Sequence, residues 1–300
     1  MRIPPYLKKG DTIGILSTAR KFKEEQLSFA IQLFHSWGFQ VKIGESIGAE
    51  EHQFAGSDEI RRRNLQEFMD DDSIQAIFCA RGGYGTMRII DGLDFSKFLH
   101  RPKWICGFSD VTVLHEHMNT LGIATLHSSM PSLFHTDAQH MSLISIERAL
   151  KGEANVYTWE QHSKNLRMQD VNAEIVGGNL SLLYALQGSV SDIQTEGKIL
   201  FMEDLDEYFY HVDRMMCSLD RAGKLKGLKA LLVGGMTDMK DNSIPFGMDV
   251  YEIINYYSEK YSYPVFYDFP CGHWENNFAI KMGMPAKIIV EDSQLIFKQD

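Results

Sequence analysis

The segment KWICGFSDVTVLH, residues 103–115, combines a predicted strand, a sharp turn and the start of a helix. Its apolar run, 104–108, has the length and composition of a buried strand, and the residues after Asp110 return to helical spacing. Ser109 therefore stands at a corner between a strand and a helix. A hydroxyl at such a corner serves as a helix N-cap, as part of an anion site or as a nucleophile. Other parts of the sequence must decide among these roles.

The same alternation of strand and helix extends through the N-terminal half. Further strands are predicted at 11–17 (DTIGILS), 39–44 (FQVKIG) and 74–80 (IQAIFCA). Amphipathic segments follow them at 23–38, at 57–71 behind the cap Ser57, and at 85–91. Near-continuous apolar strands that alternate with helices indicate an α/β fold with a parallel sheet covered on both faces.

A polar stretch, 152–171, separates this half from a second alternating region. That region begins with a strand, a glycine turn and a helix at 173–188, and it ends with a predicted hairpin at 286–297. Between them we predict strands at 198–203, 228–235 and 264–270 and helices at 207–223 and 249–261. The expected organisation is an N-terminal domain, 1–151, a connection, 152–171, and a C-terminal domain, 172–300.

The composition is that of a globular protein with well-buried cores. The 300 residues are 44% hydrophobic and 23% charged, and the formal net charge is −10. This negative charge disfavours nucleic acid as a partner. The N-terminal residues contain prolines and lysines where a signal peptide needs an apolar core, and no stretch approaches the roughly 18 apolar residues of a membrane span. The four cysteines are scattered without a CxxC motif, as expected for buried thiols in a reducing compartment. The expected location is therefore the cytoplasm.

Polar residues that directly follow predicted strands are the main candidates for a functional site, because ligands of such sheets bind at the carboxyl ends of the strands. Three of them supply the groups of acyl-transfer chemistry: Ser109 a nucleophile, His273 in PCGH a base, and Glu203 in MEDLDE an acid to orient that base. Alternatives remain open for each motif. Ser109 is also a plausible helix cap, and four carboxylates within 203–207 also fit a solvated acidic loop.

The loop ARGGYG, 80–85, offers free peptide N–H groups close to the same edge. Its glycines permit a close approach of ligand to backbone, so the loop is an anion cradle, half of an oxyanion hole or a plain tight turn. It matches neither of the common glycine-rich nucleotide motifs. His127 follows another possible strand end. His115 and His117 lie two residues apart on a predicted helix, which is not zinc-ligand spacing, so the sequence predicts no metal and no cofactor.

Taken in order, the motifs resemble the LD-carboxypeptidase family of serine peptidases (family S66), which includes the microcin C self-immunity proteins. The segments that carry the resemblance span nearly the whole chain; they are LKKGDTIGILSTA, ARGGYGTMRIID, PKWICGFSDVTVLH, TLHSSMP, VGGNLSLLYALQG, ILFMEDLDEYFYHVDRMMCSL and FPCGHWENNFAIKMGMPAKI. The resemblance implies an N-terminal domain like class I glutamine amidotransferases and a smaller C-terminal α/β domain, with the site between them. In TLHSSMP, serines replace a small His-Gly-Pro signature of other members.

The resemblance also implies roles for individual residues. Ser109, Glu203 and His273 match the catalytic triad, and the peptide N–H groups of Asp110 and Gly83 match the oxyanion hole. The implied substrate is a murein tetrapeptide that loses its terminal D-alanine during peptidoglycan recycling, and a homodimer is expected. Two residues are additional candidates for substrate contact: His127, and Arg81, which equally fits a structural salt bridge. The alternatives are an amidase for a peptidyl-nucleotide of the microcin C type and a non-catalytic module that binds a nucleotide or small anion.

Overall fold

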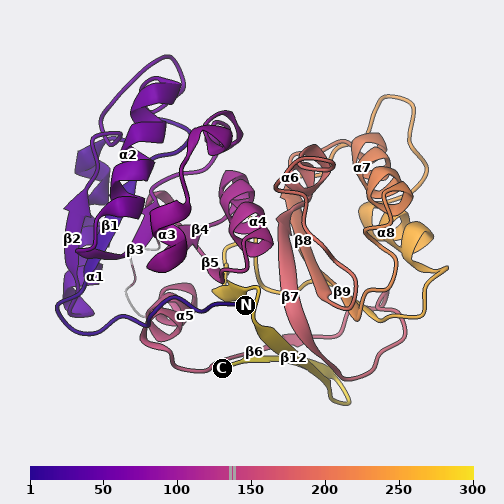
Figure 1. Cartoon of the computed structure of the whole chain (residues 1–300). Helices are drawn as coiled ribbons and strands as arrows, with labels where there is room; N and C mark the ends of the chain where they lie inside the picture. Colours follow the sequence, from indigo (N-terminus) through magenta and orange to yellow (C-terminus); the bar gives the residue numbers. More distant parts are fainter. Residues whose placement is uncertain (135–136, 138–139) are drawn as a thin grey trace.

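The computed structural model describes residues 1–134, 137 and 140–300, and it has two α/β domains side by side (Figure 1). Within the described residues, one sheet has six strands in the order β11-β5-β4-β3-β1-β2 and the other has seven in the order β10-β9-β8-β7-β12-β13-β6. The strands of the first sheet are β1 Thr12–Leu16, β2 Gln40–Ile43, β3 Ile74–Cys79, β4 Trp104–Gly107, β5 Thr125–His127 and β11 Ile280–Met282. Those of the second are β6 Asn155–Glu160, β7 Val171–Asn179, β8 Ile199–Leu205, β9 Ala230–Thr237, β10 Val265–Phe266, β12 Pro285–Val290 and β13 Gln294–Gln299.

Helices cover the parallel strands of both domains. The α-helices are α1 Ser28–Ser36, α2 Asp58–Asp70, α3 Ser96–His100, α4 Thr112–Thr120, α5 Met141–Lys151, α6 Leu180–Ala185, α7 Phe209–Arg221 and α8 Val250–Ser258. Short 3-10 turns are η1 Glu24–Leu27, η2 Thr86–Arg88, η3 Ile90–Gly92, η4 Ser109–Val111 and η5 Pro131–Leu133. The two-domain α/β architecture expected from the sequence is confirmed.

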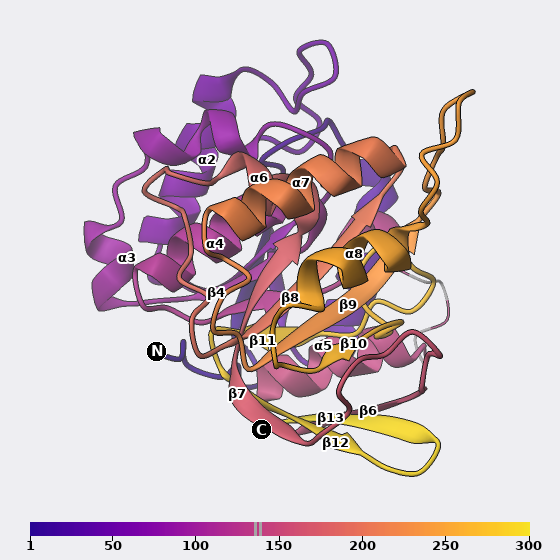
Figure 2. The same ribbon diagram turned by 90° about the vertical axis from the view of Figure 1, so that its right-hand side faces the viewer.

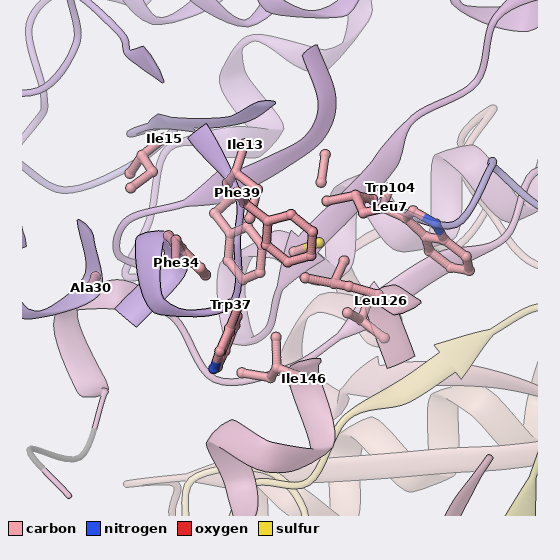
Figure 3. Close-up of a cluster of buried hydrophobic side chains, with 14 of the residues drawn as sticks. Leu7, Ile13, Ile15, Ala30, Phe34, Trp37, Phe39, Trp104, Leu126 and Ile146 are labelled. Carbon is pink, nitrogen blue, oxygen red and sulfur yellow. The ribbon is translucent and has the colours of Figure 1, made fainter. Parts of the chain in front are cut away.

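The first sheet is buried on both faces, which explains why its strands are apolar throughout. On one face, Phe34 of α1 and Ile146 of α5 pack with Ile13 and Leu126 of the sheet (Figure 3). On the other face, side chains of α2, α3 and α4 pack against the alternate residues of the same strands. Strands β2, β1, β3, β4 and β5 are parallel, so their carboxyl ends share one edge of the sheet. The turn after β4 reaches that edge.

The second sheet is parallel from β7 to β10 and antiparallel in β12, β13 and β6. Helices α6, α7 and α8 pack on one face of its parallel part (Figure 2). On the other face, Tyr157 and Trp159 of β6 join Phe201 of β8 and Phe297 of β13 in one buried cluster. In Figure 2 the segment between β9 and α8 projects away from the body of the domain.

Three local predictions are corrected by the structure. The predicted connection, 152–171, contains the strand β6, which pairs along its whole length with β13. Residues 85–91 form two 3-10 turns, η2 and η3, instead of the start of a helix. Residues 280–282, which the sequence assigns to the C-terminal domain without predicting a strand, form β11, which pairs antiparallel with β5 of the N-terminal sheet. The chain therefore returns to the first sheet for β11 and crosses back to the second sheet for β12.

The two domains meet where α4 lies beside β7 and α6 (Figure 1). The hydroxyl of Thr112, at the start of α4, accepts a hydrogen bond of 3.0 Å from the peptide N–H of Asn179 at the end of β7. A Cβ at Gly178 would lie 2.5 Å from this hydroxyl, so only glycine permits the approach. The helix that follows the Ser109 turn is thereby fixed against the second domain.

Candidate active site

Ser109 occupies a strained turn directly after β4. Its φ angle is +61°, a left-handed conformation that a non-glycine residue rarely adopts. Gly107, with φ of +148°, makes the turn possible, because a Cβ there would lie 2.9 Å from Val111. A strained serine at a strand-to-helix corner exposes its hydroxyl above the edge of the sheet. The N-cap position of this turn is Phe108 and that of α4 is Val111, so Ser109 does not fill the N-cap role.

The glycine loop lies against this serine. A Cβ at Gly82 would lie 3.2 Å from Cβ of Ser109 and 3.3 Å from its Oγ. At Gly83, with φ of +115°, a Cβ would lie 2.6 Å from the side chain of Arg20. The absence of a side chain at Gly82 brings the backbone of the loop next to Ser109, and its absence at Gly83 makes room for the side chain of Arg20. Backbone this close to a nucleophile is what an oxyanion hole made of peptide N–H groups requires, and the roles of Gly83 and Asp110 in it stay a prediction.

A buried polar network holds the glycine loop and the serine turn together. The Asp110 carboxylate accepts hydrogen bonds at its Oδ2 from the peptide N–H of Thr86, at 2.9 Å, and from the Thr86 hydroxyl, at 2.5 Å. The Thr86 hydroxyl also lies 2.8 Å from that of Thr18, after β1. The fully buried Arg61 donates to the carbonyl oxygens of Thr18 and Gly85, at 2.7 and 3.0 Å. Burial raises the pKa of Asp110, while the Thr86 hydrogen bonds and the charge of Arg61 oppose that rise.

The second domain contributes an acid and a base. Glu203, in β8, is fully buried, and its Oε2 accepts hydrogen bonds from Nδ1 of His273 at 2.5 Å and from the peptide N–H of His273 at 3.2 Å. His273 lies in the loop between β10 and β11. Gly272 lets this loop rest on β8, because a Cβ there would lie 2.7 Å from Cβ of Glu203. Glu203 thus fixes the orientation of the imidazole, which is what a general base requires.

The electrostatics of this pair favour a basic imidazole. Burial lowers the pKa of His273, but the charge of Glu203, its hydrogen bond and the charge of Asp204 raise it more, and the net effect is a pKa above the ordinary value. Asp204 points to the opposite face of β8. There its carboxylate accepts hydrogen bonds from the Asn179 side chain and the Ser181 peptide N–H, both at 2.9 Å. Burial and the charge of Glu203 raise the pKa of Asp204 to about 6.

Ser109 and His273 line one cavity of about 640 Å³, and Glu203 lies behind His273. The lining residues are Arg20, Arg81, Gly82, Gly83, Phe108, Ser109, Met130, Ser132, Leu133, Leu205, Asp206, Glu207 and His273. Residues that are far apart in the sequence, from both domains, therefore share one pocket. Arg81 and Gly83 lie where a substrate would reach them. Sequence analysis did not single out Arg20, whose position after β1 carries no motif.

The expectation that His127 contacts substrate is wrong. Its side chain is fully buried and does not line the cavity. The ring packs beside Phe108 and Phe201, with ring centroids 5.8 and 5.1 Å apart. Burial, with the nearby His115 and His273, holds the pKa of His127 well below its usual range. Strand β5 does end at His127, but the residue faces the core beneath the site instead of the cavity.

Two further findings bear on the sequence predictions. No group of three histidine, cysteine or carboxylate side chains placed to hold a metal ion occurs in the described part of the chain. Among the same residues, no helix has both the length and the apolar character needed to cross a bilayer. The absence of a metal cofactor remains a prediction.

The fold and the site together define a class of protein: two-domain α/β proteins in which a serine on a strained turn and a glutamate-bonded histidine line one cavity. Two family models identify the family. Residues 13–128 match the LD-carboxypeptidase N-terminal domain and residues 172–288 match the LD-carboxypeptidase C-terminal domain. The chain belongs to the LD-carboxypeptidase family and is a peptidase.

Individual relatives agree with this assignment. The chain is 33% identical over 288 residues to a probable murein peptide carboxypeptidase of Bacillus subtilis, an alignment that covers 94% of this chain and 90% of the relative. Its structure is similar to that of a muramoyltetrapeptide carboxypeptidase from Oxalobacter formigenes, with a TM-score of 0.86 and 27% identity over 96% of this chain and 98% of the other. The microcin C7 self-immunity protein MccF, in complex with aspartyl sulfamoyl adenosine, has the same fold, with a TM-score of 0.85 and 20% identity over 100% and 99% of the two chains.

Proposed function

We propose that this enzyme is a serine carboxypeptidase that removes the terminal D-alanine from a murein tetrapeptide by cleaving the bond between an L-configured centre and the D-residue. The observation that supports it best is the shared cavity, in which Ser109 and the Glu203-oriented His273 lie beside the glycine loop. The names of the relatives supply the substrate class. The four cysteines are unpaired, which supports a reducing compartment such as the cytoplasm. The homodimer stays a prediction.

The proposed mechanism passes through a serine ester. Nδ1 of His273 is bonded to Glu203, so Nε2 is the nitrogen left to act as a base. Nε2 takes the proton of the Ser109 hydroxyl while Oγ attacks the carbonyl carbon of the terminal peptide bond. The peptide N–H groups of Gly83 and Asp110 stabilise the oxyanion. His273 then protonates the leaving amine, the C–N bond breaks and D-alanine departs. Water repeats the steps in reverse and releases the tripeptide.

A carboxypeptidase must recognise a free C-terminal carboxylate. Arg20 and Arg81 are exposed cations that line the cavity on the side of the glycine loop. Arginine suits this task because its planar guanidinium binds a carboxylate through two parallel hydrogen bonds. We assign these two side chains to the carboxylate of the terminal D-alanine, which lies only two bonds from the scissile nitrogen.

The test uses a free murein tetrapeptide, the same peptide with a C-terminal D-alanine amide, and a pentapeptide ending in D-Ala-D-Ala. Mass spectrometry should show D-alanine released from the tetrapeptide at least tenfold faster than any cleavage of the other two. Ser109→Ala, with an unchanged melting temperature, serves as the matched inactive protein and should lower turnover by roughly three orders of magnitude or more.

Other outcomes decide among the alternatives. Rapid cleavage of both blocked peptides would contradict a carboxypeptidase. Hydrolysis of a peptidyl-nucleotide without cleavage of the tetrapeptide would favour an amidase of the microcin C type. Binding of nucleotide without turnover of any substrate would favour the non-catalytic module. Activity of Ser109→Ala within tenfold of the wild type would reject the nucleophile.

A further inference from the structure

The walls of the cavity carry charges of opposite sign. Arg20 and Arg81 lie on the wall formed by the N-terminal domain, whereas Asp206 and Glu207, at the end of β8, lie on the facing wall. The proposed mechanism uses the arginines and leaves both carboxylates without a role. In a pocket that holds a short peptide, an unused carboxylate opposite the carboxylate-binding wall is a candidate determinant of specificity.

The two carboxylates differ in how they are held. One oxygen of Glu207 accepts a hydrogen bond of 2.9 Å from the Ser181 hydroxyl, and the other is bonded to Nδ1 of His211, one turn away. The Glu207 side chain is 23% exposed. Asp206 is paired with Lys240, and its side chain is 60% exposed. Glu207 is therefore the fixed, partly desolvated carboxylate, whereas the charge of Asp206 is screened by solvent and by a lysine.

The hydrogen bonds of Glu207 leave it able to bind a ligand. Each carboxylate oxygen has two acceptor positions, so a group that already accepts one hydrogen bond per oxygen accepts more. Ser181 and His211 lock the side chain in place before any ligand arrives, which lowers the entropic cost of binding. The matching ligand group is a cation, and in a peptide a side-chain ammonium is the common one.

We propose that Glu207 selects peptides whose penultimate residue carries a side-chain ammonium, as lysine and diaminopimelate do. The inference rests on the proposed function. With the C-terminal carboxylate at Arg20 and Arg81, the scissile carbonyl lies at Ser109, and the acyl residue extends toward the facing wall. Its side chain then points to the end of β8, where Glu207 forms a charge-assisted hydrogen bond with the ammonium.

The experiment compares two tetrapeptides that differ in one group: the third residue is lysine in one and Nε-acetyl-lysine in the other. For the wild type, kcat/KM should be about tenfold higher for lysine, mainly through KM, because a charge-assisted hydrogen bond in a partly exposed site has roughly this effect. In Glu207→Gln, the ratio of the two kcat/KM values should fall to about one. In Glu259→Gln, which removes an exposed carboxylate at the end of α8, the ratio should stay as in the wild type.

Two local variants separate a specific contact from the overall charge of the wall. Asp206→Asn should lower the ratio less than Glu207→Gln does, because Asp206 is already paired with Lys240. Ser181→Ala should lower it in part, because the Glu207 carboxylate loses one of its two fixing donors. If Asp206→Asn lowers the ratio of the two kcat/KM values as much as Glu207→Gln does, the special role of Glu207 in selecting the substrate is rejected.

The same measurements distinguish this inference from the proposed function. Equal cleavage of both peptides by the wild type, or an unchanged ratio in a well-folded Glu207→Gln protein, would overturn the inference and leave the carboxypeptidase intact. Cleavage of neither peptide by the wild type, together with hydrolysis of a different amide, would overturn the proposed function and the inference with it.

Discussion

The two walls of the cavity are built by different means. The N-terminal wall presents the backbone of the glycine loop and of the Ser109 turn beside the exposed Arg20 and Arg81. Asp110 and Arg61 are buried behind it. The C-terminal wall presents side chains, with His273 oriented by the buried Glu203. Asp110 and Glu203 are both buried carboxylates next to a reactive residue. Asp110 joins the glycine loop to the Ser109 turn, whereas Glu203 orients the imidazole of His273. Burial alone therefore does not reveal which role a carboxylate has.

The largest effect should come from breaking the C-terminal wall with Glu203→Gln. The amide keeps the size of the side chain but loses the negative charge that favours a protonated His273 and the acceptor that sets its tautomer. We expect kcat to fall by about four orders of magnitude with a small change in KM, since loss of the orienting acid has this effect in other triads. The charge of Glu203 raises the pKa of His273. The residual activity, which requires neutral His273, should therefore appear at lower pH than in the wild type. Steady-state kinetics across pH measure both effects.

Asp204→Asn is the matched control for this prediction. Asp204 is the next residue in β8, is also buried, and points to Asn179 and Ser181 instead of His273. Its replacement should cost stability but less than tenfold in kcat. A larger loss of kcat for Asp204→Asn than for Glu203→Gln, at temperatures where both are folded, would show that the wrong carboxylate has been assigned to the base.

A smaller effect should come from breaking the N-terminal wall with Thr86→Val. Valine has the shape of threonine but no hydroxyl, so the Asp110 carboxylate keeps the peptide N–H of Thr86 and loses the side-chain donor. The glycine loop is then held less firmly against Ser109. We expect kcat to fall about tenfold with KM nearly unchanged, because an oxyanion donor acts in the transition state. The unfolding free energy should fall by about 1–3 kcal/mol, the usual cost of an unpaired buried polar group.

Thr195→Val controls for the loss of stability. Thr195 is also buried, and its hydroxyl donates one hydrogen bond of 2.7 Å to the carbonyl oxygen of Lys224, in the C-terminal domain and outside the cavity lining. It should lower the melting temperature to a similar extent and leave kcat unchanged. Equal losses of kcat in the two variants would mean that the Thr86 network has no role beyond stability.

The contrast between the walls also shows what a sequence reveals. Ser109, Glu203 and His273 were each predictable as site candidates because each follows an apolar run at the carboxyl end of a predicted strand. These strands belong to two different sheets, and only the family resemblance implied that the site lies between the domains. The pairing of Thr86 with Asp110 was not predictable, because it joins two loops whose contact depends on the complete fold.

His127 shows a related limit of prediction from sequence. The sequence places it at a strand end, but alternation along the strand decides which side it faces, and it faces the core.

The same reasoning applies to the strands that were missed. In β6 the buried residues alternate with exposed ones, Tyr157 and Trp159 pointing inward, but the polar residues between them made the segment resemble a connection. Strand β11 has three residues, and nothing in so short a stretch reveals that its partner is β5 of the other domain. Pairing between distant segments is set by packing that only the folded chain provides.

The smallest effect on activity should come from Glu116→Gln, at the contact between the two domains. Glu116 lies in α4, is fully buried, and accepts a hydrogen bond from the peptide N–H of Gly177 in β7. Burial raises the pKa of this carboxyl to about 8, despite that hydrogen bond and the charge of Lys224. The folded protein therefore holds a proton that the unfolded chain, with an ordinary glutamate, releases near pH 4.5. The stability that depends on protonated Glu116 is fully present below about pH 4.5. It decreases as the pH rises above that value and is lost once the pH passes about 8.

Glutamine mimics the protonated acid and does not titrate, so Glu116→Gln should gain stability relative to the wild type as the pH rises from 5 to 8.5. Because one pKa unit corresponds to about 1.4 kcal/mol, we expect the difference in unfolding free energy between variant and wild type to change by about 4 kcal/mol over this range. Urea unfolding at several pH values measures it, with the exposed Glu259→Gln as a control whose difference from the wild type should not vary. Activity should stay within threefold of the wild type, since Glu116 touches neither wall of the cavity. If the difference in unfolding free energy between Glu116→Gln and the wild type does not vary with pH, this carboxyl is ionised in the folded protein. The contact between α4 and β7 then contains a buried negative charge.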